Sequence, residues 1–175
     1  MTAPFIIEPL GPSHDRTHFS SGVEALDRYF REQVTQDVRR RVTACYVAIE
    51  LTTSKIAVYY TLAAAGVPLV HMPESLVKRL PRYPSIPVAR LGRLAIDKNY
   101  RGRKLGAALL WDAVMRAVRS EVAVFALIVD AKDEQAEAFY LHHGFVTFGS
   151  LPTQLVLPLT SLFLKTSGEK GSYPT

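Results

Sequence analysis

Residues 90–110 read RLGRLAIDKNYRGRKLGAALL and place a strand-like segment, a basic loop with glycines and a helix one after the other. Gly102 and Gly106 let the backbone turn sharply and approach a ligand, because they carry no Cβ atom. The backbone N–H groups of such a loop, with the start of the following helix, suit a phosphate. Arg101, Arg103 and Lys104 add positive charge there. The stretch therefore predicts an anion site, most simply for the pyrophosphate of a cofactor.

Two familiar phosphate-binding motifs are missing from the sequence. It contains neither the GxxxxGK[ST] run of nucleotide hydrolases nor the GxGxxG run of dinucleotide-binding proteins. An ordinary strand–turn–helix connection with solvated arginines remains the alternative interpretation of the loop. The helix itself is well indicated, because apolar residues recur at helical spacing at Ala107, Leu110, Val114, Ala117 and Val118.

A second strand and helix are predicted downstream. The continuous apolar run of residues 122–129 is typical of a central strand that is buried on both faces. In the helix that follows, Asp130 or Asp133 can serve as the N-cap, and Gly144 supplies the C-terminal stop. One face of this helix carries Ala136, Phe139 and Tyr140.

These motifs resemble those of the GCN5-related N-acetyltransferases, the GNAT family. The shared pattern is a strand, an RGxxxG loop, a helix, a second strand and the motif AxxFYxxxGF, which here spans residues 136–145. The resemblance is closer to the acetyltransferase toxins of bacterial toxin–antitoxin pairs, and it covers about residues 5–160. Further matching segments are FSSG (19–22), LDRYF (26–30), YYTL (59–62), the proline-rich stretch into Pro87 and Val88, RLA (93–95) and PTQL (152–155).

The resemblance implies an α/β (α+β) fold of the GNAT type. Its central sheet is mixed, largely antiparallel and twisted, is flanked by helices, and splays open between two central strands to receive acetyl-CoA. Tyr140 matches the family tyrosine that protonates the departing thiolate as a general acid, the alternative being a core aromatic residue beside Phe139. No metal site is expected. The residues expected to contact acetyl-CoA are Leu94, Ala95, Ile96, Arg101, Gly102, Arg103, Lys104, Leu105, Gly106, Ala107, Asp133, Ala136 and Tyr140.

The chain departs from the family pattern at two positions. Lys104 stands where the family loop usually has a glycine. Because the phosphate contacts are mainly backbone N–H groups, an outward-pointing lysine is tolerated there and adds charge. Val58 stands where related toxins usually show a glycine before two tyrosines, which affects the substrate side of the sheet.

The sequence shows no obvious general base, and this favours one kind of amine substrate. Glu50 is a candidate base on the substrate strands, whereas His142 and His143 read as a feature of a helix C-terminus. A lysine amine of pKa ~10.4 is about 0.1% free base at pH 7.4, while an α-amine of pKa ~7.7–8.0 is partly free. The esterified amino acid of charged tRNA offers such an α-amine. We therefore expect N-acetylation of aminoacyl-tRNA, which blocks peptide-bond formation.

The positive charge of the chain is concentrated in two clusters. The net charge is +5, and a surplus of cations suits a polyanion such as RNA, the alternative being a solvated basic face. The first cluster runs from Lys78 to Lys104, opposed only by Asp97. The second contains Arg28, Arg31, Arg39, Arg40 and Arg41. The residues predicted to contact tRNA are Arg79, Arg82, Arg90 and Arg93.

The resemblance also implies partners. An antitoxin of the ribbon-helix-helix type is expected to block the site or the cofactor loop, operator DNA is contacted only through the antitoxin complex, and the toxin forms a homodimer. Two rival functions remain open. One is an ordinary N-acetyltransferase for a small amine or a protein N-terminus, and the other is a non-catalytic module that binds acetyl-CoA or RNA.

Size and composition predict one domain over residues 1–164, which the resemblance makes the acetyltransferase domain, and a disordered tail over residues 165–175. No apolar stretch has the length of a membrane span, and no secretion signal is visible, so a cytoplasmic protein is expected. The single cysteine, Cys45, is predicted to be buried and inert.

The remaining elements are predicted from local patterns. Ser21 and Glu24 form a capping box in front of an apolar helical stripe. Five prolines within residues 66–88 indicate a substrate-side loop with a short helix over residues 74–80. The expected strands are residues 5–10, 43–50, 55–64, 145–148 and 154–164.

Overall fold

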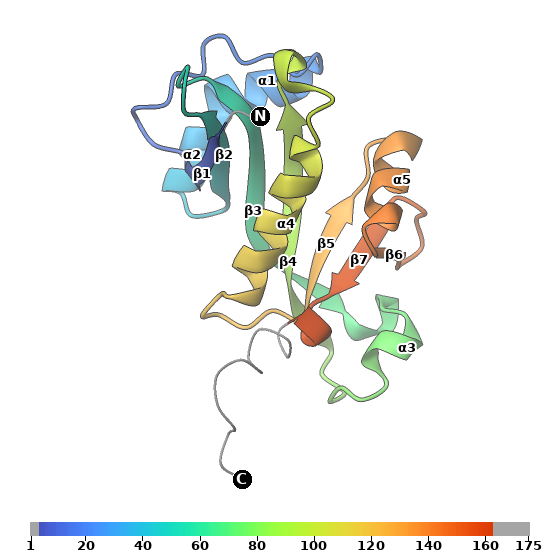
Figure 1. The fold of residues 1–175 in the computed structure, drawn as a ribbon. Coiled ribbons are helices and arrows are strands. Elements are labelled where there is room, and N and C mark those ends of the chain that lie inside the picture. The colour runs from blue at the N-terminus through green and yellow to red at the C-terminus, as the bar shows by residue number, and fades with distance from the viewer. Residues whose placement is uncertain (1–3, 163–175) are drawn as a thin grey trace. The chain divides into compact units, whose positions relative to one another are not determined.

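The computed structural model describes residues 4–162, and the chain divides into two compact units. Unit 1 comprises Met1–Ala63 and Leu91–Ala113, and unit 2 comprises Ala64–Arg90 and Val114–Thr175. Seven strands form one sheet in the order β1-β2-β3-β4-β5-β7-β6 (Figure 1). The sheet is mixed and mostly antiparallel, which confirms the predicted fold class. The predicted tail, residues 165–175, lies outside the described residues.

Unit 1 is built on three antiparallel strands, β1 (Phe5–Pro9), β2 (Ala44–Glu50) and the first part of β3 (Ile56–Pro68). A helical stretch crosses them as α1 (Glu24–Arg28), a π-helical turn (Tyr29–Gln33) and α2 (Val34–Arg39). Its apolar side packs on the strands, because Phe30 stacks on Tyr59 with 4.2 Å between ring centroids. Phe19 closes this aromatic cluster, and all three rings are buried.

The second part of unit 1 leads to the anion loop. The end of β4 (Ser85–Ile96) runs into a 3₁₀ turn (Lys98–Tyr100), and α4 (Leu105–Val118) begins after residues 101–104. The apolar stripe predicted for α4 is largely confirmed. Leu110, Val114, Ala117 and Val118 are buried, while Ala107 is half-buried.

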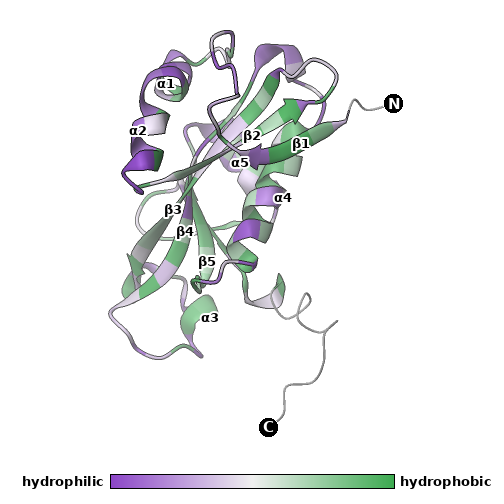
Figure 2. Ribbon diagram, turned by 90° about the vertical axis from the view of Figure 1, so that its left-hand side faces the viewer, coloured by the Kyte–Doolittle hydropathy of each residue, from purple (hydrophilic) through white to green (hydrophobic). Residues whose placement is uncertain are grey.

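Unit 2 contains β5 (Ala126–Asp130), β7 (Gln154–Pro158) and the short β6 (Val146–Thr147). Its helices are a 3₁₀ turn (Leu69–His71), α3 (Glu74–Val77) and α5 (Glu134–His142). Strand β5 is largely green, hence apolar, in Figure 2. The core of the unit gathers Val67, Val88, Ile128, Phe148 and Val156.

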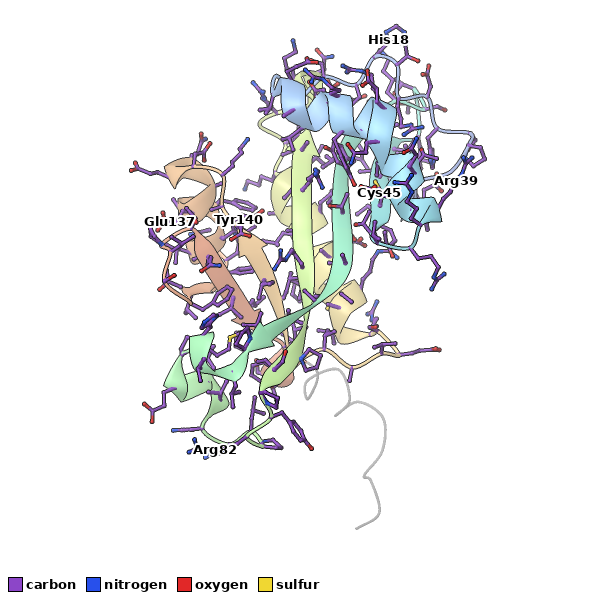
Figure 3. The ribbon with its side chains drawn as sticks, turned by 180° about the vertical axis from the view of Figure 1, so that it is seen from behind. His18, Arg39, Cys45, Arg82, Glu137 and Tyr140 are labelled. Atoms are coloured by element: carbon purple, nitrogen blue, oxygen red, sulfur yellow. The ribbon has the colours of Figure 1, made fainter. Side chains whose placement is uncertain are left out.

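Cys45 lies in β2 with 4% of its surface exposed, so its predicted burial is confirmed (Figure 3). Burial raises the pKa of its thiol to about 12, which keeps the sulfur protonated and unreactive at neutral pH. No helix among residues 4–162 is both long enough and apolar enough to cross a bilayer.

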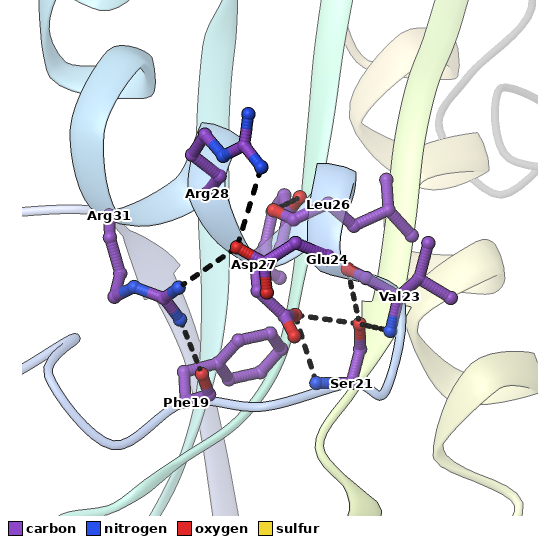
Figure 4. A network of polar contacts seen from close by, with 9 residues as sticks. Phe19, Ser21, Val23, Glu24, Leu26, Asp27, Arg28 and Arg31 are labelled. Carbon is purple, nitrogen blue, oxygen red and sulfur yellow. Dashed lines mark hydrogen bonds and ion pairs between the residues drawn. The ribbon is translucent and has the colours of Figure 1, made fainter.

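The predicted capping box of the first helix is wrong. Helix α1 begins at Glu24 after Val23, which offers no side-chain cap (Figure 4). Gly22 adopts φ +88°, so the chain turns left-handed immediately after Ser21. The Ser21 hydroxyl instead accepts from the Val23 N–H at 3.2 Å and donates to the buried Asp27 carboxylate at 2.7 Å. The Ser21 hydroxyl is therefore bonded to the buried Asp27 carboxylate and does not make the reciprocal bonds with Glu24 that define a capping box.

Several boundaries also differ from prediction, most clearly that of β5. This strand begins at Ala126 rather than at residue 122, and Val122 is 75% exposed. Only Ala126–Asp130 finds partners on β7, where Ala126 lies opposite Pro158, so the earlier apolar residues form the connection from α4. Strand β7 likewise ends at Pro158, β3 extends to Pro68, and α3 ends at Val77.

Candidate functional site

One candidate element is the end of β4 with the loop that follows it, in unit 1. Leu94, Ala95 and Ile96 form the last residues of β4. The Asp97 N–H donates to the Ala57 carbonyl at 2.8 Å, which ties the loop to β3. The Asp97 carboxylate, 5% exposed, accepts from the N–H groups of Ser20 at 3.0 Å and Asn99 at 2.8 Å. One buried carboxylate therefore fixes the point where the strand becomes the loop.

The loop backbone has the shape that a phosphate cradle requires. Gly102 adopts φ +78° and Lys104 φ +58°, so the chain turns left-handed twice before α4 begins. A Cβ atom at Gly102 would meet nothing within 4 Å, so open space lies beside this backbone. The first N–H groups of α4, those of Leu105, Gly106 and Ala107, lack partners within the helix. This arrangement fits the pyrophosphate of a nucleotide-type cofactor.

The three cations of the loop have different surroundings. The Arg101 guanidinium donates to the Ser21 carbonyl, so this side chain also holds the turn before α1. Arg103 lies 5.1 Å from the centroid of the Tyr100 ring. Lys104 is exposed, and within residues 4–162 its ammonium makes no hydrogen bond or ion pair. Lys104 is therefore the loop cation best able to pair with a phosphate.

Replacing Lys104 with glycine is expected to raise stability and weaken cofactor binding. A left-handed non-glycine residue is unfavourable, so the glycine should stabilise the fold by about 0.5–1 kcal/mol. Loss of an exposed charge pair should weaken acetyl-CoA binding about two- to fivefold. Urea unfolding and calorimetric titration measure both quantities. Lys104→Met is the control that keeps the strain and removes the charge, and a destabilised Lys104→Gly variant would contradict the assignment.

A separate candidate element is helix α5, in unit 2. Asp133, rather than Asp130, is its N-cap, because the Asp133 carboxylate accepts from the Ala136 N–H at 2.8 Å. Tyr140 lies near the other end and is 8% exposed (Figure 3). Its ring makes edge contacts with Phe139 and Phe145, at centroid distances of 5.2 and 5.3 Å. Local helix geometry and two aromatic contacts therefore fix the direction of this side chain.

Burial determines the acid–base character of Tyr140. Desolvation raises the pKa of its hydroxyl to about 12, so the group stays protonated throughout the physiological range. A thiol leaving group has a pKa of ~8.5, so complete proton transfer from Tyr140 to a thiolate is uphill. The arrangement suits a hydroxyl that donates a hydrogen bond to a developing negative charge.

The arginines predicted to contact tRNA do not all belong to one unit. Arg79, Arg82 and Arg90 are exposed in unit 2, where Arg82 extends outward in Figure 3. Arg93 is half-buried in unit 1, with its guanidinium 3.5 Å from the centroid of the Tyr29 ring. Tyr29 in turn donates to the Asp37 carboxylate at 2.8 Å. The ring attracts the Arg93 cation electrostatically and so holds the guanidinium in place.

Glu50 is poorly suited to act as a general base. Its carboxylate accepts from the hydroxyls of Tyr100, Thr52 and Thr53. The hydrogen bond from Tyr100 lowers the pKa of Glu50, which makes this carboxylate a weaker base than usual. His143 is the C-cap of α5, and its Nδ1 atom lies 2.8 Å from the Phe139 carbonyl oxygen. Within residues 4–162 no group of three metal-ligating side chains could hold a metal ion.

Sequence reasoning missed the role of Asp97. The available signal was its position as the single acid among the cations of residues 78–104, directly between strand and loop. The stacking of Arg93 on Tyr29 had no local signal, because it joins residues far apart in the chain.

Comparison with known proteins adds to this geometry. An Acetyltransferase (GNAT) domain model matches residues 79–154. A tRNA-acetylating toxin of Mycobacterium tuberculosis is 31% identical over 150 residues, which cover 85% of this chain and 88% of the relative. The chain belongs to the GNAT acetyltransferase family. A probable toxin TacT of Sinorhizobium fredii is 26% identical to this GNAT chain over 167 residues, covering 90% of the chain and 92% of the relative.

Solved structures resemble the GNAT chain over nearly its whole length. AtaT complexed with acetyl-methionyl-tRNAfMet has a TM-score of 0.86 and 29% identity, covering 93% of this chain and 99% of that one. AtaTR bound with acetyl-CoA has a TM-score of 0.79 and 27% identity, covering 93% and 98%. A KacTA–DNA complex has a TM-score of 0.77 and 26% identity, covering 94% and 99%. These likenesses confirm the predicted GNAT fold and the predicted toxin branch.

Proposed function

We propose that this chain is the toxin of a toxin–antitoxin pair, with residues 1–164 as one catalytic domain, and that it acetylates the α-amine of aminoacyl-tRNA. The observation that carries this proposal is the likeness to AtaT in complex with acetyl-methionyl-tRNAfMet, which covers 93% of the chain. The 31% identity to a tRNA-acetylating toxin supports it independently. An acetylated amine is no longer a nucleophile, so the modified aminoacyl-tRNA cannot accept the growing peptide.

Acetyl-CoA is the acyl donor of this reaction and supplies a thioester, which is an activated acetyl group. The left-handed turns at Gly102 and Lys104 and the start of α4 would hold its pyrophosphate. The backbone of Leu94, Ala95 and Ile96 would bind the pantetheine arm. Asp133 and Ala136 would contact the donor at the start of α5, because Asp133 fixes that end of the helix.

Tyr140 would stabilise the thiolate as it leaves. Its hydroxyl stays protonated because its pKa is raised to about 12, so it can donate to the developing charge on sulfur. The α-amine needs little help from a base, since an appreciable fraction is unprotonated at neutral pH. This matches the surroundings of Glu50, whose lowered pKa makes it a poor proton acceptor. A site with a hydroxyl donor at Tyr140 and no effective base therefore suits an α-amine better than a lysine side chain.

RNA and protein partners follow from the proposed reaction. Arg79, Arg82, Arg90 and Arg93 would contact tRNA phosphates. The solved relatives AtaTR and KacTA–DNA support an antitoxin partner and a DNA complex formed through it. We assign the antitoxin to the ribbon-helix-helix type and the toxin to a homodimer. Use of charged tRNA would place the reaction in the cytoplasm.

The raised pKa of Tyr140 leads to a titration prediction. A tyrosine of ordinary pKa is half ionised at pH 10, whereas Tyr140 should remain protonated there and lose its proton only near pH 12. Ultraviolet difference titration should therefore show equal tyrosinate absorbance for wild type and Tyr140→Phe up to pH 10. An excess of about half a tyrosinate in wild type at pH 10 would show that the hydroxyl is not desolvated.

Cell-free translation distinguishes the proposal from its rivals. Adding the purified chain should stop protein synthesis only when acetyl-CoA is present, and Tyr140→Phe should relieve the block. An ordinary N-acetyltransferase for small amines or protein N-termini would consume acetyl-CoA and leave translation running. A non-catalytic binding module would inhibit equally with and without acetyl-CoA, and equally after Tyr140→Phe.

A further inference from the structure

Three consecutive arginines stand at the end of helix α2 and directly after it: Arg39, Arg40 and Arg41, here called the α2 basic end. All three side chains are exposed, and Figure 3 shows Arg39 at the periphery of the molecule. The same end of α2 is strongly hydrophilic in Figure 2. Residues 36–43 contain no aromatic side chain, so this surface offers charge without an aromatic anchor.

The backbone places Arg41 where a glycine is normally preferred. The Val42 N–H donates to the Asp37 carbonyl and the Arg41 N–H to the Val38 carbonyl, each at 3.1 Å. These two bonds define a Schellman motif, whose left-handed position is most often glycine. Arg41 occupies that position with φ +61°. Glycine at this position would make the fold more stable, so stability does not explain why the residue is an arginine.

The charges of the α2 basic end are unopposed, unlike those of its neighbours. Arg28 and Arg31 lie 3.7 and 3.8 Å from the Glu24 carboxylate. The Asp37 carboxylate, one turn before the basic end, accepts from the Tyr29 hydroxyl. Within residues 4–162, Arg39, Arg40 and Arg41 form no ion pair. The helix dipole favours cations in the last turn, but it does not require one at the strained position after it.

We propose that Arg39, Arg40 and Arg41 bind phosphates of the RNA substrate. This inference rests on the proposed function and adds a contact outside the arginines at 79, 82, 90 and 93. A row of exposed, unpaired cations matches the repeating charge of a nucleic-acid backbone. A protein partner is less favoured, because protein interfaces centre on clusters of aromatic and apolar anchors, whereas Val42, 61% exposed, is the one exposed apolar side chain among residues 36–43. A role in RNA binding then explains why an arginine occupies the left-handed position in place of the more stable glycine.

The variant Arg41→Gly separates binding from folding, since the two explanations predict opposite changes. Glycine suits the left-handed position, so the melting temperature should rise by about 2–4 °C. Fluorescence anisotropy with unfractionated tRNA in 0.1 M salt should show roughly five- to eightfold weaker binding, the factor given by one counterion-releasing contact. The slope of log affinity against log salt should fall in magnitude by about 1. A higher melting temperature with unchanged tRNA affinity would overturn the proposal.

Neighbouring arginines provide the matched control. The pair Arg28→Gln and Arg31→Gln removes two cations that share the Glu24 carboxylate and should weaken tRNA binding less than the loss of two unopposed cations does. The pair Arg39→Gln and Arg40→Gln should weaken binding about as much per charge as Arg41→Gly does. If both pairs weaken binding equally, the effect is one of net charge and the proposed contact is wrong.

A parallel acetylation assay keeps this inference distinct from the proposed function. Failure of the wild type to acetylate charged tRNA would refute the proposed function. If the wild type is active, Arg41→Gly should raise KM for charged tRNA about five- to eightfold and leave kcat unchanged. Weaker binding of the antitoxin with unchanged tRNA affinity would mean that an acidic protein, rather than RNA, contacts the α2 basic end.

Discussion

Replacing Tyr140 with phenylalanine is expected to lower acetyl transfer to aminoacyl-tRNA by about 10²–10³-fold, the usual cost of removing one hydrogen-bond donor to a developing negative charge. The hydroxyl is the one group removed, and the rings of Phe139 and Phe145 keep their contacts with the aromatic ring at 140. Stability should therefore change by less than about 1 kcal/mol. The raised pKa keeps the Tyr140 hydroxyl protonated, so that it can donate a hydrogen bond to the sulfur. Since the negative charge on sulfur develops only in the transition state, losing this bond should lower kcat rather than raise KM.

Steady-state kinetics with charged tRNA and thermal unfolding measure these two effects. Tyr83→Phe is the matched control, since Tyr83 is 65% exposed and undergoes the same chemical change. Because Tyr83 lies beside Arg82 in the substrate-side loop, kcat is the quantity compared, and this control should keep the wild-type kcat. Equal activity of Tyr140→Phe and wild type would remove Tyr140 from the catalytic assignment and leave it as a core residue.

Replacing Asp97 with alanine is expected to destabilise unit 1 and damage the cofactor loop together. The substitution leaves the N–H groups of Ser20 and Asn99 without the carboxylate that they now bond at 3.0 and 2.8 Å. Losing charge-assisted bonds at a buried position should lower the free energy of unfolding by about 2–4 kcal/mol. Since Asp97 lies directly before the loop, affinity for acetyl-CoA should fall as well.

Two variants interpret the Asp97 result. Asp97→Asn keeps an oxygen acceptor and should recover part of the lost stability. Asp15→Ala removes an exposed carboxylate that accepts from the Thr17 N–H and should change stability by less than about 1 kcal/mol. Urea unfolding with calorimetric titration of acetyl-CoA provides both readouts. An Asp97→Ala variant with wild-type stability and affinity would contradict the anchoring role.

The parts of the fold that sequence predicted are those encoded locally. The apolar stripe of the helix after the RGRKLG loop and the left-handed turn at Gly102 appear where expected. Gly106, however, lies in the first turn of α4, and the second left-handed residue of the loop is Lys104. The N-cap at Asp133 follows from a side chain bonding three residues ahead. The fold class, a mixed and mostly antiparallel sheet flanked by helices, followed from the family resemblance rather than from any local pattern.

The parts that sequence did not predict depend on contacts between distant residues. The local pattern at Ser21 is that of a capping box, but Gly22 turns the chain and the Ser21 hydroxyl donates to the buried Asp27 carboxylate instead. The apolar residues 122–125 fit a strand, but β7 pairs only from Ala126 onward. The surroundings of Arg93 and Asp97 likewise arise from segments far apart in the chain. Such competition between local and tertiary partners is where pattern-based inference is weakest.

The most direct test of the proposed function is transfer of labelled acetyl from acetyl-CoA to tRNA. Charged and deacylated preparations of the same tRNA should be compared with wild type and Tyr140→Phe. We expect label on charged tRNA alone, released by mild alkaline hydrolysis as an N-acetyl amino acid, with the label strongly reduced in the variant. Label on neither tRNA, together with consumption of acetyl-CoA by free amines or peptides, would contradict the toxin assignment and leave an ordinary N-acetyltransferase.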